Sequence, residues 1–261
     1  MRKLHKRLAL GSEKGFTLIE MAIVLVIIGI ILGAIMKGKD VMRSAQTKQL
    51  YQGFIGKWVS MADTYYDKTG SNLGDGASNG GGGTGSTVVD GLMDGIDAST
   101  TDTLRKAIRD VLIRAGINPC EIIKSGNIED RAVCEVTGVN IGQGIVDSEV
   151  YGKVKNINAY LYYYLLKESA TANHKRNLVV FRNVPIDIAQ ALDTMIDGIA
   201  DGQAGRFLNL AVCATAADAD TAGPGAPTNG ADLTTALKPW NDGMAAGTNT
   251  YKCVVGYVLE H

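Results

Sequence analysis

A long, uninterrupted run of apolar residues near the N-terminus is the strongest pattern in the chain. From Phe16 to Met36 the sequence has 21 residues, and Glu20 is the only charged residue among them. A bilayer core about 30 Å thick needs roughly 20 apolar helical residues, so this segment predicts a membrane-spanning helix. Five cations and one anion precede the run, which favours a cytoplasmic N-terminus and an outward C-terminal part.

Apolar residues at helical spacing continue beyond this run, until Thr69 and Gly70 end the pattern. They are Val41, Ala45, Ile55, Val59 and Ala62. We therefore expect one helix over 16–68, about 80 Å long at about 1.5 Å per residue. Its parts are a transmembrane segment, 16–36, and an amphipathic continuation, 37–69.

The rest of the chain, 70–261, predicts a globular head that contains both helices and strands. Apolar residues recur at helical spacing over 104–115 and 185–198. Runs rich in β-branched or aromatic residues predict strands over 157–166, 177–184, 206–213 and 251–259. Polar, glycine-rich sequence predicts loops over 70–91 and 214–249. The expected fold class is α+β, with the long N-terminal helix packed against an antiparallel sheet.

Composition and charge narrow the possible partners. The formal charge is −1 for the whole chain and −5 for residues 16–261, because residues 1–15 contain five cations and one anion. An acidic chain is not expected to bind nucleic acid through bulk charge. The length beyond the long helix suffices for one hydrophobic core.

Four cysteines lie on the predicted outer side, where oxidation is favoured: Cys120, Cys134, Cys213 and Cys253. Three pairings are possible. We favour Cys120 with Cys134, which closes a short loop, and Cys213 with Cys253, which joins two late strands. The sequence contains no CxxC motif and no histidine cluster, so we do not expect a zinc site.

A carboxylate within an apolar span is unfavourable unless it finds a partner or a proton, so Glu20 requires an explanation. A secretory signal has small residues after its apolar region, whereas here Gly15 precedes it. The stretch from Gly15 to Gly29 reads GFTLIEMAIVLVIIG. It resembles the class III signal of type IV pilins and of type II secretion pseudopilins, nearly residue for residue.

The resemblance implies a processing and assembly route. Prepilin peptidase would cut between Gly15 and Phe16, and Phe16 would be N-methylated. The single-pass precursor would lie in the bacterial inner membrane, meet an assembly platform there, and join copies of itself or sibling pilins in a periplasmic or extracellular filament. The new amine of Phe16 would neutralise Glu20 of a neighbouring subunit, which favours one register.

Three functions remain open from the sequence. The first is a structural subunit of a pilus serving adhesion, motility or DNA uptake, and the second is a pseudopilin of a type II secretion system. A third, of another class, is a membrane-anchored binding or catalytic domain whose helix is a simple tether.

Little in the sequence indicates an enzyme or a cofactor. Asp193 and Asp197 lie one helical turn apart, and we interpret them as a solvated helix face and not an acid/base pair. Asp75, Asn79 and Asp90 are candidate oxygen ligands for calcium, but the EF-hand spacing is absent. We expect no enzymatic activity, no cofactor and no metal.

Overall fold

Two compact units make up the chain in the structure, which is a computed structural model. The first unit is Met1–Met42 and the second is Arg43–His261. The structure describes residues 17–81, 88–97, 102–123, 143–148, 151–167, 173–210, 213–216, 228–233, 237, 239, 240 and 251–261.

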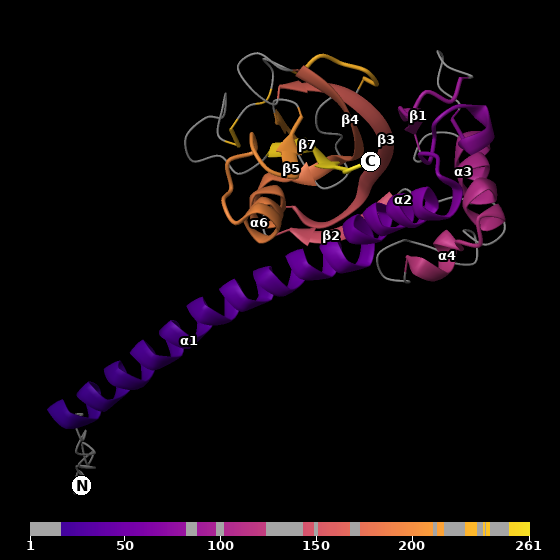
Figure 1. Ribbon diagram of the computed structural model, residues 1–261. Coiled ribbons are helices and arrows are strands. Elements are labelled where there is room, and N and C mark those ends of the chain that lie inside the picture. The colour runs from indigo at the N-terminus through magenta and orange to yellow at the C-terminus, as the bar shows by residue number, and fades with distance from the viewer. Residues whose placement is uncertain are drawn as a thin grey trace, which may run out of the picture. The chain divides into compact units, whose positions relative to one another are not determined.

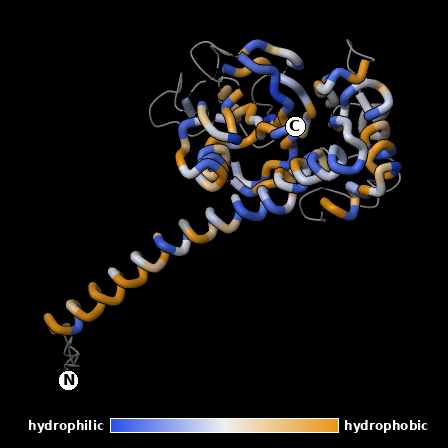
Figure 2. Tube along the Cα trace, in the orientation of Figure 1, coloured by the Kyte–Doolittle hydropathy of each residue, from blue (hydrophilic) through white to orange (hydrophobic). Residues whose placement is uncertain are grey.

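The first unit contains the start of helix α1 (Leu18–Leu50), as the apolar run predicts. Every described side chain from Thr17 to Lys39 is exposed, and apolar colouring dominates the first turns of the helix (Figure 2). The helical segment Leu18–Thr69 includes a stretch long and apolar enough to cross a membrane. Apolar surface of this extent is unfavourable in water, at roughly 25 cal/mol per Å², so it requires lipid or protein around it.

In the second unit the helical backbone continues without a break to Thr69. Helix α1 passes into a π-helix, η1 (Tyr51–Ile55), and then into α2 (Gly56–Thr69). Gly70 ends the segment in the left-handed conformation, with φ 70°, and its N–H donates to the carbonyl of Tyr66. The predicted long helix is confirmed, whereas the π turn is a feature that the apolar pattern does not predict.

The head contains one antiparallel sheet, and the fold is α+β, as predicted (Figure 1). Among the described residues its strands are β1 (Asp94–Asp97), β2 (Gln143–Ser148), β3 (Gly152–Lys167), β4 (Asn173–Pro185), β5 (Phe207–Asn209), β6 (Ala214–Thr215) and β7 (Tyr251–Val258). The order is β1-β3-β4-β7-β5, while β2 pairs with β3 and β6 pairs with β7.

Helices α3 (Asp102–Arg114) and α6 (Ile186–Asp197) lie close to the predicted ranges. Pro185 occupies the N-cap position of α6 without a side-chain capping hydrogen bond, and Gly198, with φ 85°, ends the helix. Two short elements complete the described helices: η2 (Ala77–Asn79) and α4 (Pro119–Ile122).

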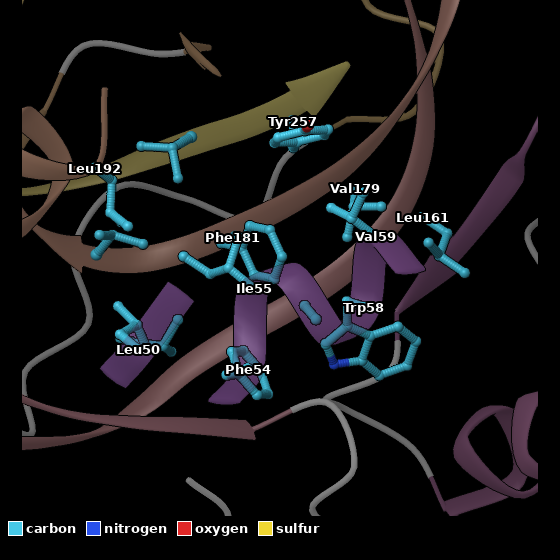
Figure 3. Packing of buried hydrophobic residues seen from close by; sticks show 14 of the residues in the cluster. Leu50, Phe54, Ile55, Trp58, Val59, Leu161, Val179, Phe181, Leu192 and Tyr257 are labelled. Carbon is cyan, nitrogen blue, oxygen red and sulfur yellow. The ribbon is translucent and has the colours of Figure 1, made fainter. Parts of the chain in front are cut away.

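One face of the sheet packs against α2 and its preceding π turn (Figure 3). The rings of Phe54 and Phe181 meet edge to face, with their centroids 5.8 Å apart. Phe54 also lies over Gly144 of β2, where an added Cβ would be 2.6 Å from its ring. The absence of a side chain at Gly144 therefore allows the helix to approach the sheet.

The other face of the sheet has its own apolar cluster, built on Tyr160, Tyr162 and Tyr164 of β3. Leu178 and Val180 of β4 pack beside these tyrosines. The middle parts of β3 and β4, 159–162 and 178–181, are consequently buried on both faces, which matches their continuous apolar sequence there.

The sheet differs from the sequence prediction at its margins. The predicted strand 206–213 is shorter, because β5 covers only Phe207–Asn209. Strands β1, β2 and β6 were not predicted, since β1 and β2 contain Gly and Asp, which are depleted in strands, and β6 is very short. Strands β1 and β2 form because β3 offers its backbone hydrogen bonds to both.

Candidate functional site

The first turn of α1 contains a reciprocal set of hydrogen bonds between Thr17 and Glu20. Oε2 of Glu20 accepts hydrogen bonds from the Thr17 backbone nitrogen at 2.7 Å and from Thr17 Oγ1 at 2.8 Å. Thr17 Oγ1 in turn accepts a 3.3 Å hydrogen bond from the Glu20 backbone nitrogen. This arrangement is a capping box, which provides partners for backbone N–H groups that a helix start otherwise leaves unpaired.

The capping box gives the Glu20 carboxylate hydrogen-bond partners within its own chain, but only for one of its oxygens. Oε2 accepts both hydrogen bonds, and within the described residues Oε1 accepts none. The carboxylate is exposed in the single chain, so Oε1 can reach a group outside it. Sequence reasoning missed the capping box, although the pattern Thr-x-x-Glu at the start of an apolar run was the available signal.

Beyond Glu20, the described helix presents apolar side chains and glycines with no cover from its own unit. Gly29 and Gly33 have the small-xxx-small spacing that lets membrane helices approach one another. An added Cβ at either position meets nothing within 4 Å. Packing inside the chain therefore gives no reason for glycine at these two positions.

The predicted processing residues, Gly15 and Phe16, lie outside the described residues, so cleavage and methylation remain predictions. Cys134 also lies outside them. Cys213 and Cys253 form a disulfide, with an S–S distance of 2.02 Å and Cα atoms 4.3 Å apart. Cys120 is also disulfide-bonded.

The three calcium candidates lie together, in contact with the protein backbone. The carboxylate of Asp75 accepts hydrogen bonds from the backbone nitrogens of Asp90 and Gly91, each at 2.9 Å. The side chain of Asn79 donates to the carbonyl of Asp75 at 2.8 Å and accepts from the hydroxyl of Tyr65 at 2.7 Å. These hydrogen bonds join the described parts of the glycine-rich segment, 70–81 and 88–91, to each other and to α2. The described residues contain no group of three or more His, Cys, Asp or Glu placed to hold a metal.

The expectation of a solvated face at Asp193 is wrong. Asp193 is fully buried, and its Oδ2 accepts hydrogen bonds from Trp240 Nε1 at 2.7 Å and from the Gly202 backbone nitrogen at 2.9 Å. Burial raises the pKa of this carboxyl, and the two hydrogen bonds lower it only in part. Asp197 is half-buried and binds the backbone nitrogens of Arg206 and Phe207. Both carboxylates fix the loop between α6 and β5.

Comparison with known proteins identifies the N-terminal segment. Residues 10–36 match the prokaryotic N-terminal methylation motif, which is the class III prepilin signal of type IV pilins and pseudopilins. Comparisons with curated proteins and with solved structures gave no significant match. The motif supports a pilin-like or pseudopilin precursor and, together with the apolar helix, a membrane-anchored chain. A motif of this type suggests a structural protein.

Proposed function

We propose that the chain is a structural subunit of a type IV pilus or a related filament that serves adhesion, motility or DNA uptake. The observation that carries this proposal is the apolar helix surface from Leu18 to Met36, which is exposed in the single chain and lies within the methylation motif, 10–36. In the precursor, lipid covers this surface. In the filament, the helices of neighbouring subunits take the place of lipid.

Glu20 would set the register of that assembly. Its Oε2 is held by Thr17, and its Oε1 is available to the methylated amine of Phe16 in a neighbouring subunit. A buried pair of this kind adds little net stability compared with an apolar pair. A wrong stagger, however, leaves both charges unpaired in an apolar core, so one register is favoured.

Mass spectrometry of the protein isolated from its host tests the processing step. We expect the chain to begin at Phe16 and to carry one additional methyl group on its amine. An intact Met1 would contradict the proposal.

Glu20→Ala tests the assembly step. We expect leader removal to continue and filaments to be absent or irregular by electron microscopy. Glu20→Asp is the control, because it shortens the same side chain and keeps the carboxylate. Normal filaments from Glu20→Ala would show that Glu20 has no role in assembly. A chain that keeps its function after the whole apolar span is replaced by another would favour the alternative, in which the helix is a simple tether.

A further inference from the structure

An open pocket of about 270 Å³ lies between one face of α2 and the end of strand β7. Three of its lining residues, Asp63, Tyr66 and Asp67, come from α2. Residues three and four apart on a helix are neighbours on one face, so these side chains lie beside one another. Tyr257 of β7 and His261 contribute further lining. Two carboxylates of one helix and aromatic rings from two elements therefore meet at this pocket.

Tyr66 and His261 form a stacked pair of rings at the pocket. Their centroids are 4.2 Å apart, and the angle between the ring planes is 27°. The side chain of His261 is only 12% exposed, whereas Tyr66 is 37% exposed. The stack therefore fixes the tyrosine ring and leaves part of it accessible.

The imidazole of His261 is neutral near pH 7. Burial lowers its pKa, and the neighbouring charges of Asp63 and Asp67 offset this only in part. Nδ1 lies 3.6 Å from Oδ1 of Asp63, while Nε2 is buried without a hydrogen-bond partner among the described residues. A proton on Nε2 would have no acceptor there. His261 consequently does not neutralise either aspartate.

The guanidinium that lines the pocket is already engaged. Arg206 is the only cation in the described lining, and it forms an ion pair with Glu260 and donates a 3.5 Å hydrogen bond to the hydroxyl of Tyr257. Burial raises the pKa of Asp63, and the charge of Arg206 offsets this only in part. With Asp67, the lining contains three carboxylates and one guanidinium, an excess of two negative charges.

Asp67 is the least engaged of these carboxylates. It is exposed, and it has no hydrogen bond or ion pair within the described part of the chain. The next residue, Lys68, donates instead to the carbonyls of Ala115 and Gly116, at 3.0 Å and 3.4 Å. The carboxylate of Asp63 likewise has no ion pair apart from its contact with the neutral imidazole. Such a pocket attracts cations.

The chemistry of the pocket favours one kind of cation. An aromatic face attracts a cation placed over it, and a planar guanidinium also stacks on such a face. Carboxylates accept parallel N–H donors from the same group. A bare metal ion would need several ligands at once, and the described residues contain no group of three or more His, Cys, Asp or Glu placed to supply them.

We propose that this pocket binds a guanidinium group, the chemistry of an arginine side chain or of a small free guanidinium compound. The guanidinium lies against the ring of Tyr66 and donates hydrogen bonds to the carboxylates of Asp63 and Asp67. The ion pair between Arg206 and Glu260 stays intact. This binding is separate from filament assembly.

The test uses NMR on the full chain in detergent at low, constant ionic strength, with N-acetylarginine amide as the probe. N-acetylcitrulline amide, which has nearly the same shape and no charge, is the matched control ligand. Histidine-selective labelling makes His261 a reporter in the pocket, and His174 of β4, which is outside the lining, is the internal reference. We expect only the arginine compound to shift the His261 signal and to lower the pKa of its imidazole further, because a bound cation disfavours a second positive charge.

Variants separate the contributions of charge and ring. Asp63→Asn/Asp67→Asn removes both charges at nearly constant volume and should weaken binding of N-acetylarginine amide by about tenfold. Tyr66→Leu removes the ring and should bind about threefold more weakly than Tyr66→Phe, which keeps it. Glu121→Gln removes an exposed carboxylate from α4, outside the pocket, and should leave binding unchanged. If the double variant fails to fold, the comparison of the two Tyr66 variants still decides the matter.

A comparison of probes identifies the source of the guanidinium. If N-acetylarginine amide binds more tightly than propylguanidinium, the ligand is a protein side chain; the reverse order indicates a free small compound. Equal binding of N-acetylcitrulline amide, or unchanged affinity in either Asp63→Asn/Asp67→Asn or Tyr66→Leu, would overturn the proposal. Because the assay measures binding to single chains in detergent, neither outcome bears on the assembly role.

Discussion

The backbone nitrogen of Thr17 donates a 2.7 Å hydrogen bond to the carboxylate of Glu20 within the same chain. The carboxylate therefore has a partner before any neighbouring subunit arrives. This contact fixes the start of α1 and directs the charge of Glu20 toward the first turn of the helix, where a carboxylate also interacts favourably with the helix dipole.

Removal of the Thr17 hydroxyl tests whether this arrangement contributes to assembly. Thr17→Ala loses the N-cap, a change that typically lowers helix stability by about 1 kcal/mol, whereas Thr17→Ser keeps the hydroxyl. We expect fewer filaments from the alanine variant and near-normal numbers from the serine variant. Sheared filaments quantified against total processed subunit give the measurement, and equal yields from the two variants would show that the cap has no role in assembly.

Gly29 and Gly33 give a second prediction, about contacts between helices. Gly29→Leu and Gly33→Leu add side chains where the chain itself leaves at least 4 Å open, so the isolated subunit should insert into the membrane and be processed normally. Close helix approach in the filament should be blocked, and filament yield should fall. Ile30→Leu is the control on the same helix. Normal yield from both glycine variants would indicate that neither glycine lies at a helix contact.

The disulfide between Cys213 and Cys253 gives a prediction about the stability of the head. It closes a sequence separation of 40 residues next to the β6–β7 pairing. The double variant Cys213→Ser/Cys253→Ser should lower the free energy of unfolding by about 2 to 4 kcal/mol. Urea denaturation followed by tryptophan fluorescence measures this change while leaving the bond of Cys120 intact.

The close contact between Gly144 and Phe54 predicts a pair of compensating substitutions. Gly144→Ala places a methyl group against the ring of Phe54 and should destabilise the head by about 1 to 3 kcal/mol. Adding Phe54→Leu removes the clash, so the double variant should lose less stability than the two single losses added together. A double-mutant cycle from urea denaturation checks this coupling, and strictly additive values would contradict it.

The buried carboxyl of Asp193 predicts a specific pH dependence. Burial raises its pKa in the folded state, so its protonated form favours folding. This contribution is complete below the ordinary aspartate pKa of about 3.9 and is lost as the pH rises through the folded-state value. Relative to Asp193→Asn, which is neutral throughout, the original chain should therefore become less stable as the pH rises toward neutrality. Unfolding in urea at acidic and neutral pH measures the difference, and a constant difference would contradict the raised pKa.

A companion variant tests the hydrogen bonds of the same residue. Asp193→Ala leaves Trp240 Nε1 and the Gly202 backbone nitrogen without an acceptor and should lower the free energy of unfolding by about 1 to 3 kcal/mol. Thr194→Ala, at an exposed neighbouring position, is the control. An equal loss in the two variants would argue against a specific role for the buried carboxylate.

The sequence by itself determined the elements whose signal is local. The apolar run after Gly15 and the glycine at position 70 predicted the long helix, because helix length, periodicity and termination depend on neighbouring residues. Strands β3, β4 and β7 were predicted for the same reason, since their β-branched and aromatic residues form continuous runs.

Only the tertiary structure decided the features that depend on distant partners. Strands β1 and β2 exist because β3 pairs with them, and Asp193 is buried because Trp240 and Gly202 approach it from segments outside its helix. A hydrogen bond or a cavity between residues far apart in sequence leaves no periodic signal along the chain, so folding alone brings such groups together.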